Sequence, residues 1–132
     1  MKKNCTLIQS VNLSLKYIEN FFNLDESQLY MRNLTQSVLW RREKIKMWGK
    51  EIVTKRRIAW YADDGKSYTY SGSTFFPSQW NNVLLQLKER VENYSDIKFN
   101  SVLLNEYPNG EVGMGWHSDD EKELGVDPVI AS

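Results

Sequence analysis

The sequence predicts one folded domain of mixed helices and strands, and three observations lead to this prediction. Its 132 residues are 41% hydrophobic and 26% charged, as in an ordinary globular domain. Two segments, at about 26–37 and 77–94, carry apolar residues at helical spacing. Segments typical of strands occur at 52–61, 67–71 and 99–107. We therefore expect a sheet on which at least the second helix lies.

The first helix and the first pair of strands have clear local signals. The run Asn23-Leu24-Asp25-Glu26 is typical of a helix start. Tyr30, Leu34 and Val38 then recur at i, i+4 and i+8, which predicts a helix over about 26–37. The run Asp63-Asp64-Gly65-Lys66 has turn composition, so the strands on either side of it are predicted to form a hairpin.

The second helix has the longest apolar stripe in the sequence. Pro77 is a residue type that can open a helix. The stripe consists of Val83, Leu84, Leu87, Val91 and Tyr94. A strand over 99–107 then ends at the turn 108–110. The last run, 128–132, has the composition of a further strand, so the domain is expected to continue beyond the given sequence.

Composition excludes several classes of protein. The lone Cys5 allows neither an internal disulfide nor a paired-cysteine metal site. No apolar run approaches the roughly 20 residues of a membrane span. We expect a single domain over 1–132 with residues 1–16 as a flexible lead-in. Its expected location is intracellular, either cytoplasmic or, in a eukaryote, nuclear, with no membrane partner.

Charge is segregated although the formal net charge is zero. Between residues 41 and 57, eight basic residues outnumber two acidic ones, a net charge of +6. Between residues 106 and 127, seven acidic residues outnumber one lysine, a net charge of −6. The first segment can bind a polyanion and the second a cation. The alternative is that both are solvated surfaces that attract each other.

The run His117-Ser118-Asp119 is the strongest candidate for chemistry. Side chains at i and i+2 of an extended segment point to the same side, so this imidazole and this carboxylate can share a metal ion. Non-haem Fe(II) sites use two histidines and one carboxylate on one face of the metal. His117 is the only histidine in the sequence, and an exposed histidine beside an acidic turn is the alternative.

The surrounding sequence resembles the AlkB family of Fe(II)/2-oxoglutarate dioxygenases, in particular the branch that repairs alkylated nucleic acid. The resemblance extends over about 17–132 and includes an ordered series of short segments. These segments are 17–24, 48–50, Arg56, 59–61, 68–72, Trp80, 99–100, 104–110, 115–121 and 130–132.

This resemblance implies an α+β fold built on a double-stranded β-helix, or jelly roll, with N-terminal helices and a nucleotide-recognition lid. It implies oxidative dealkylation of N-alkylated bases in DNA, or in RNA, with Fe(II), O2 and 2-oxoglutarate. The products would be formaldehyde, succinate and CO2. His117 and Asp119 take the positions of catalytic metal ligands. Asn105 and Tyr107 match a pair that binds 2-oxoglutarate, and otherwise they are a strand-end asparagine and a core tyrosine.

Other positions match residues that contact nucleic acid in the family. Tyr68, Tyr70 and Ser71 match lid residues of the base pocket, where aromatic faces suit an extruded base. Glu121, next to Asp120, can accept a hydrogen bond from the exocyclic amine of adenine or cytosine, or be part of a solvated acidic run.

Two matches fall in the basic segment. Trp48 matches an apolar finger that fills the gap left by a flipped base, and the alternative is a buried hairpin tryptophan. Arg56 matches an arginine near the nucleic acid, where Lys55 and Arg57 can add phosphate contacts.

The resemblance also shows what the sequence lacks. A complete family domain continues to a second metal-binding histidine and to an arginine that pairs with 2-oxoglutarate, and neither occurs here. The C-terminal part of the jelly roll is therefore expected to be missing. Lys55 also stands where the family usually has proline, and Ala62 where it often has glycine. The alternative function is an inactive truncated homologue that only binds nucleic acid. The complete protein is expected to be a monomer.

Overall fold

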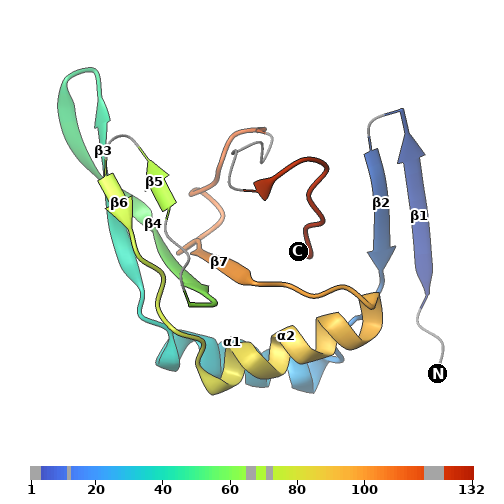
Figure 1. The fold of residues 1–132 in the computed structure, drawn as a ribbon. Helices are drawn as coiled ribbons and strands as arrows, with labels where there is room; N and C mark the ends of the chain where they lie inside the picture. Colours follow the sequence, from blue (N-terminus) through green and yellow to red (C-terminus); the bar gives the residue numbers. More distant parts are fainter. Residues whose placement is uncertain (1–3, 12, 65–67, 71–72, 118–123) are drawn as a thin grey trace. The chain divides into compact units, whose positions relative to one another are not determined.

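The computed structural model describes residues 4–11, 13–64, 68–70, 73–117 and 124–132. The chain divides into two compact units, Met1–Ser37 and Val38–Ser132. The first contains β1 (Cys5–Ser10), β2 (Leu13–Ile18) and α1 (Leu24–Ser37). The second contains β3 (Arg41–Met47), β4 (Lys50–Ala62), β5 (Tyr68–Tyr70), β6 (Ser73–Phe75), α2 (Asn82–Ser95) and β7 (Ser101–Glu106). Figure 1 shows these elements along the chain.

In the first unit, β1 and β2 form an antiparallel hairpin, with Cys5 opposite Ile18 and Ser10 opposite Leu13. This segment largely coincides with the flexible lead-in expected at 1–16, so the structure gives it a regular pairing that the sequence did not predict. β1 has no clean alternation, because Leu7 and Ile8 are adjacent and both are exposed. β2 does alternate, from Leu13 to Tyr17, and this strand signal was missed.

The first helix is confirmed, and its start has the predicted cause. The Asn23 side-chain oxygen accepts a hydrogen bond from the Glu26 backbone N–H at 2.9 Å, and the Glu26 carboxylate accepts one from the Asn23 N–H at 3.0 Å. This reciprocal pair is a capping box, which satisfies two backbone donors at the start of α1. Phe22 packs edge-on against Tyr30, with 5.1 Å between the ring centroids.

The second unit is organised around a three-stranded antiparallel sheet in the order β3-β4-β7. β3 and β4 form a hairpin whose two connecting residues, Trp48 and Gly49, both have positive φ. Two positive φ angles are typical of the turns that suit the twist of a hairpin, and glycine adopts this conformation without steric cost. A register shift between Arg42 and Lys44 makes a bulge near the other end of β3.

The predicted hairpin between the strands before and after residues 63–66 is wrong. β4 pairs with β3 on one side and with β7 on the other, and β5 pairs with β6 instead. The turn composition of Asp63-Asp64 does not determine which strand follows as the partner of β4. Residues 57–62 of β4 pair with 101–106 of β7, so this edge of β4 is not available to the next strand in the sequence. The pairing of β4 with β3 stops at Ile58, and farther along β4 Tyr61 forms an isolated parallel β-bridge with Ser78.

The second helix is confirmed, but it begins at Asn82 and not near Pro77. Asn81 is the N-cap, because its side chain accepts a hydrogen bond from the Leu84 N–H at 3.0 Å. The helix ends at Ser95, and the C-cap residue Asp96 has a left-handed conformation (φ 57°) that directs its N–H to the Glu92 carbonyl at 2.8 Å. The Asn81 cap therefore determines where α2 begins, and the start predicted from Pro77 was too early.

The core of the second unit combines the inner part of β4 with the start of α2. The buried apolar residues are Val38, Ile58, Ala59, Tyr61, Ala62, Val83 and Leu84. The Tyr61 hydroxyl accepts a hydrogen bond from the Leu39 backbone N–H at 2.9 Å. β4 is therefore the central strand both in pairing and in burial.

Two further expectations can be compared with the described residues. The strand over 99–107 is confirmed as β7, but 128–132 forms no strand, because no described segment pairs with it. The elements confirm a mixed helix-and-strand fold with one three-stranded and two two-stranded sheets. Among the described residues, no helix is both long and apolar enough to cross a membrane.

Candidate functional site

Asn105 and Tyr107 lie on the same face of the sheet. Asn105 is opposite Ile58 in the pairing of β7 with β4, and Tyr107, two residues after Asn105, directly follows β7. Side chains two residues apart in extended backbone point to the same side. The Trp60 indole N–H donates to the Ser101 hydroxyl at 2.7 Å from the same face. We call the side of the sheet that carries Asn105 and Tyr107 the polar face.

The predicted pair is accessible to a ligand. Asn105 is exposed, and Tyr107 has 40% of its surface exposed, so it is not the buried core tyrosine that was the alternative. Asn105 offers both an amide donor and a carbonyl acceptor, and Tyr107 offers a hydroxyl. Two neutral donors on one face can bind a carboxylate by hydrogen bonds.

Arg56 lies two residues before Ile58 on β4, and Ile58 is opposite Asn105, so Arg56 is on the polar face. Its guanidinium donates to the Glu43 carboxylate at 2.6 Å. It also lies 3.6 Å from the Met114 sulfur, which brings the segment before His117 to this face. Partial burial lowers the pKa of Arg56, but the Glu43 carboxylate and then the nearby Tyr107 side chain outweigh it, so the pKa is above its ordinary value.

The opposite face of the same strands carries a second arginine with different partners. Arg57 forms a two-pronged ion pair with Glu106, directly opposite it on β7. Its guanidinium also lies 5.5 Å from the centre of the Trp40 ring. The Arg57 guanidinium lowers the pKa of Glu106. The phosphate contact expected for Arg57 stays a prediction, and in this structure its guanidinium is held by Glu106.

The loop 108–116, after β7, leads to His117. It is exposed, and its Nδ1 lies 2.8 Å from the carbonyl oxygen of Gly115. A carbonyl only accepts, so Nδ1 carries the hydrogen, and in the neutral ring Nε2 carries the lone pair that a metal requires. The predicted ligand Asp119 lies outside the described residues, as do Asp120 and Glu121. No three potential metal ligands gather among the residues that are described.

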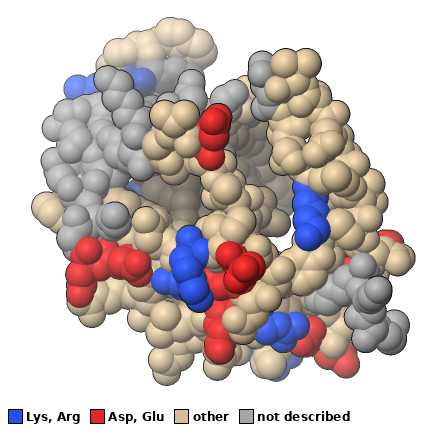
Figure 2. Space-filling model, turned by 45° about the vertical axis from the view of Figure 1, so that its right-hand side comes forward, with Lys and Arg blue, Asp and Glu red and all other residues tan. Residues whose placement is uncertain are grey.

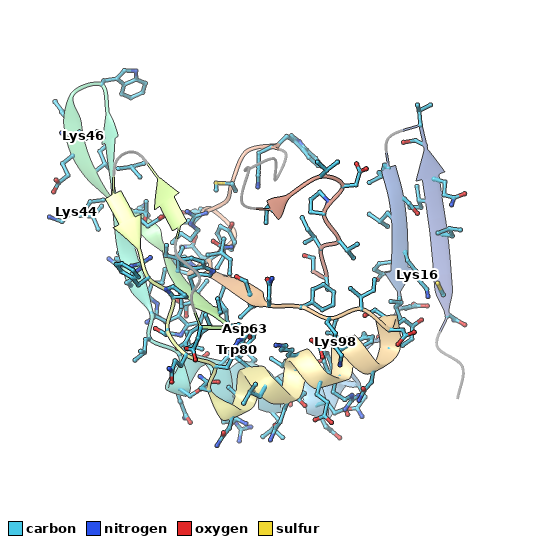
Figure 3. All side chains as sticks on the ribbon, in the orientation of Figure 1. Lys16, Lys44, Lys46, Asp63, Trp80 and Lys98 are labelled. Atoms are coloured by element: carbon cyan, nitrogen blue, oxygen red, sulfur yellow. The ribbon has the colours of Figure 1, made fainter. Side chains whose placement is uncertain are left out.

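The tip of the β3–β4 hairpin presents Trp48 to solvent. Its side chain is 92% exposed, which does not fit the alternative of a buried hairpin tryptophan. Lys46 and Lys50 beside it are exposed, and Lys44 forms an ion pair with Glu51 at 2.9 Å. Lys44 and Lys46 project from this hairpin in Figure 3. The Glu51 carboxylate raises the pKa of Lys44.

The predicted lid residues fall partly within the described chain. Tyr68 and Tyr70 both lie on β5, opposite Phe75 and Ser73 of β6. Ser71 lies outside the described residues.

Sequence reasoning missed a cluster at the end of β4. The Trp80 indole N–H donates to the Asp63 carboxylate at 2.9 Å, and the Lys88 ammonium lies 3.4 Å from the same oxygen. Lys88 also lies 4.6 Å from the centre of the Trp80 ring. Figure 3 shows Asp63 and Trp80 close together near the start of α2. No local pattern signals these contacts, because the partners are 17 and 25 residues apart.

Charge is more mixed on the surface than along the sequence. On the face shown in Figure 2, basic and acidic side chains lie beside one another. Within the basic segment, Glu43 pairs with Arg56 and Glu51 pairs with Lys44. Glu106 of β7 pairs with Arg57. The exposed lysines near the hairpin tip therefore remain the better candidates for phosphate contacts.

Comparison with known proteins identifies the family. Residues 14–132 match the model of the 2OG-Fe(II) oxygenase superfamily. The chain belongs to the 2OG-Fe(II) oxygenase superfamily. Its relatives include DNA oxidative demethylase ALKBH2 of Mus musculus, 34% identical over 128 residues, which are 95% of this chain and 53% of that protein.

Two further relatives support the AlkB-like assignment within the superfamily. Alpha-ketoglutarate-dependent dioxygenase alkB homolog 3 of Rattus norvegicus is 40% identical over 116 residues, which are 85% of this chain and 38% of that protein. ALKBH2 of Bos taurus is 39% identical over 89 residues, 67% of this chain and 32% of that protein. The chain thus spans about a third to a half of the length of these relatives.

Membership of the 2OG-Fe(II) oxygenase superfamily implies Fe(II), 2-oxoglutarate and O2. The described residues fit this set as far as they extend. In the neutral His117 ring with Nδ1 donating to the Gly115 carbonyl, the lone pair is on Nε2, and the side chains of Asn105 and Tyr107 are exposed. Contact between Arg56 and Met114 connects that face to the loop that leads to His117.

Proposed function

We propose that this chain is part of an Fe(II)/2-oxoglutarate-dependent dioxygenase that removes N-alkyl groups from bases in DNA, or in RNA. The observation that supports the proposal is the contact of Arg56 with Met114, which brings the segment before His117 to the face of the sheet that carries Asn105. It is supported by relatives whose names are DNA oxidative demethylase and alpha-ketoglutarate-dependent dioxygenase. Nucleic acid as substrate would place the enzyme in the cytoplasm or, in a eukaryote, in the nucleus.

Each site residue has a proposed task. His117 and Asp119 hold the metal ion, which when bound supplies the oxidising chemistry that converts the N-alkyl carbon to formaldehyde. Asn105 and Tyr107 donate hydrogen bonds to 2-oxoglutarate, which is converted to succinate and CO2. These residues bind and orient the reactants, so that the reacting groups meet without the entropic cost of a free encounter. The Gly115 carbonyl holds the orientation of the His117 ring.

The proposed nucleic-acid contacts lie on separate elements of the second unit. Trp48 would enter the gap left by an extruded base, with Lys46 and Lys50 near the phosphates. Tyr68, Tyr70 and Ser71 would line the base pocket as part of a lid, and Glu121 would accept a hydrogen bond from the base. Arg56 was predicted to lie near the nucleic acid, and it shares the polar face with the proposed 2-oxoglutarate site.

The jelly roll and its lid are part of the same proposal. In a jelly roll, inward-facing residues of neighbouring strands point into one cavity, which suits a metal site with its co-substrate. The antiparallel sheet β3-β4-β7 would be one part of that architecture, and further strands would come from the whole protein. We expect the whole protein to be a monomer.

The test is turnover. The whole protein of which this chain is part would be incubated with Fe(II), 2-oxoglutarate, O2 and an oligonucleotide that carries an N-methylated adenine or cytosine, in single-stranded and duplex form. We expect succinate and formaldehyde in equal amounts, dependent on the methyl group. His117→Ala should abolish both products, whereas Glu89→Gln, an exposed change on α2, should not. Failure of the His117 change to alter product formation would contradict the assigned site.

A second candidate function is nucleic-acid binding without turnover. It is favoured by the exposure of Trp48, since an apolar tip between lysines can engage a base gap whether or not a metal site is complete. Both candidates predict weaker binding at higher salt, so salt dependence does not separate them. Tight binding of the methylated oligonucleotide without succinate would establish the second candidate for this chain.

A further inference from the structure

Arg56 connects β4 to the loop that leads to His117. One terminal nitrogen of its guanidinium donates to the Glu43 carboxylate at 2.6 Å, and the other lies 3.6 Å from the Met114 sulfur. Sulfur is larger than oxygen, so 3.6 Å is within the range of an N–H···S hydrogen bond, and the charge of the donor strengthens it. Met114 precedes His117 by three residues. The contact therefore holds the loop at a point close to the predicted metal ligand.

The guanidinium is itself fixed at the bulge of the β3–β4 hairpin. The Thr54 hydroxyl accepts a hydrogen bond from the Glu43 backbone N–H at 3.2 Å and donates one to the Arg56 carbonyl oxygen at 2.9 Å. These bonds join the two strands at the register shift between Arg42 and Lys44. The Arg56 side chain is 17% exposed and that of Glu43 is 32% exposed, so water only partly screens their ion pair. Arg56 thus has a firm anchor on the sheet.

The backbone around Met114 is open by comparison. Among the described residues, a Cβ added at Gly113 or at Gly115 would have no atom within 4 Å outside its own chain neighbours. The Met114 side chain is 55% exposed. The Gly115 carbonyl oxygen lies 2.8 Å from Nδ1 of His117, so a displacement of the loop would move both the ring and the group that orients it. The contact with Arg56 is therefore placed to influence the direction of Nε2 of His117.

We propose that Arg56, anchored by Glu43, is a positioning residue that holds the loop through the Met114 sulfur and so orients His117 for the metal ion. The inference rests on the proposed function, in which His117 is a metal ligand. It adds that Arg56 acts on the metal site through Met114 and does not bind the metal itself.

Binding of Co(II) to the whole protein of which this chain is part measures the effect. Co(II) takes the place of Fe(II) without turnover, and its visible absorption spectrum depends on the ligands around it. Met114→Leu removes the sulfur acceptor and keeps an apolar side chain of similar size. We expect the Co(II) Kd of this variant to rise about fivefold and its spectrum to change.

Two further variants show whether the sulfur acts as an acceptor. Met114→Gln places an amide oxygen near the position of the sulfur and should restore the native Kd, whereas a Kd as high as in Met114→Leu would overturn the proposal. Met31→Leu is the matched control, since it makes the same change at an exposed methionine of α1, and it should alter neither the Kd nor the spectrum.

Arg56→Leu has two effects of opposite sign. Removal of a cation by itself favours the binding of another cation and so lowers the Co(II) Kd. Loss of the anchor frees the loop, and the positioning role predicts a Kd about fivefold higher in spite of the lost charge. An unchanged or lower Kd would overturn the proposal. In the double variant with Met114→Leu, the Kd should rise no further, and additive losses would contradict an action through the sulfur.

The proposal stays testable if Arg56→Leu does not fold. Met114 is an exposed residue, so Met114→Leu is expected to fold, and an unchanged Kd and spectrum in that variant would by themselves overturn the positioning role.

His117→Ala separates this inference from the function on which it rests. A whole protein that keeps the native Co(II) Kd and spectrum after His117→Ala would refute His117 as a metal ligand, and the positioning role with it. Loss of Co(II) binding in His117→Ala, together with a native Kd in Met114→Leu, would refute the positioning role alone.

Discussion

Replacing Leu84 by alanine should destabilise the second unit far more than the same change at Leu85. Leu84 is 2% exposed and Leu85 is 45% exposed, although they are adjacent on α2. The two changes alter helix propensity equally, so the difference between them isolates burial. Truncation of a buried leucine costs the lost transfer free energy and leaves a cavity, together about 2–5 kcal/mol. The exposed change should cost less than about 1 kcal/mol.

Urea denaturation followed by tryptophan fluorescence would measure both variants. Trp40, Trp60 and Trp80 all lie in the second unit, so the signal reports on its unfolding. We expect an unchanged slope and a lower midpoint for Leu84→Ala, with a free energy of unfolding at least about 2 kcal/mol below that of Leu85→Ala. Equal losses in the two variants would refute the conclusion that α2 packs through Leu84.

Three further changes test other contacts. Tyr61→Phe removes the hydroxyl that accepts from the Leu39 N–H, and since Tyr61 is 2% exposed the free energy of unfolding should fall by about 1–2 kcal/mol in the same denaturation assay. Glu92→Gln should weaken the fold at neutral pH. Lys98, and then the Phe99 backbone N–H, lower the pKa of Glu92 below its ordinary value of 4.5. The stabilisation from this carboxylate is therefore present above that pH and is lost as the pH falls through the lowered pKa, so the curves of stability against pH for the native chain and for Glu92→Gln should converge below pH 4.5. Trp48→Ala should weaken oligonucleotide binding, measured by fluorescence anisotropy, about tenfold and leave the melting temperature unchanged.

Each of these changes has a matched control and a contradicting result. Tyr17→Phe removes a hydroxyl from an exposed tyrosine and should cost less than about 0.5 kcal/mol, so an equal loss in Tyr61→Phe and Tyr17→Phe would contradict the role of the Leu39 contact. Glu89→Gln makes the Glu92 change at an exposed position of the same helix, and a pH dependence equal to that of Glu92→Gln would contradict the role of the Lys98 contact. A lower melting temperature in Trp48→Ala would show that Trp48 supports the fold and not only binding.

Local signals predicted those elements whose cause is local. The start of α1 followed from Asn23 and Glu26 because a capping box is made within four residues. The apolar stripe of α2 and the strand β7 followed from side-chain periodicity. The start of α2 was placed too early, because Pro77 and Asn81 are both start signals, and only the second forms the cap.

The candidate site was predictable where spacing alone decides it. Asn105 and Tyr107 are predicted to share a face because they are two residues apart, and in the structure Asn105 lies on β7 and Tyr107 directly follows it. Arg56 could not be placed on the same face from the sequence, because Glu43 and Met114 are 13 and 58 residues away from it. The tasks of Trp48, Tyr68 and Tyr70 in binding nucleic acid stay predictions.

The sequence by itself determined the family, the helical stripes and the residue types available for a metal and a carboxylate ligand. These depend on the identity of side chains and on contacts within one or two turns of chain. Only the tertiary structure decided that β4 lies between β3 and β7, and that Arg56 and Arg57 point to opposite faces with different partners. The pairing of β4 with β7 joins residues 39 to 49 positions apart, and backbone hydrogen bonds are the same for every sequence, so local sequence does not identify this partner.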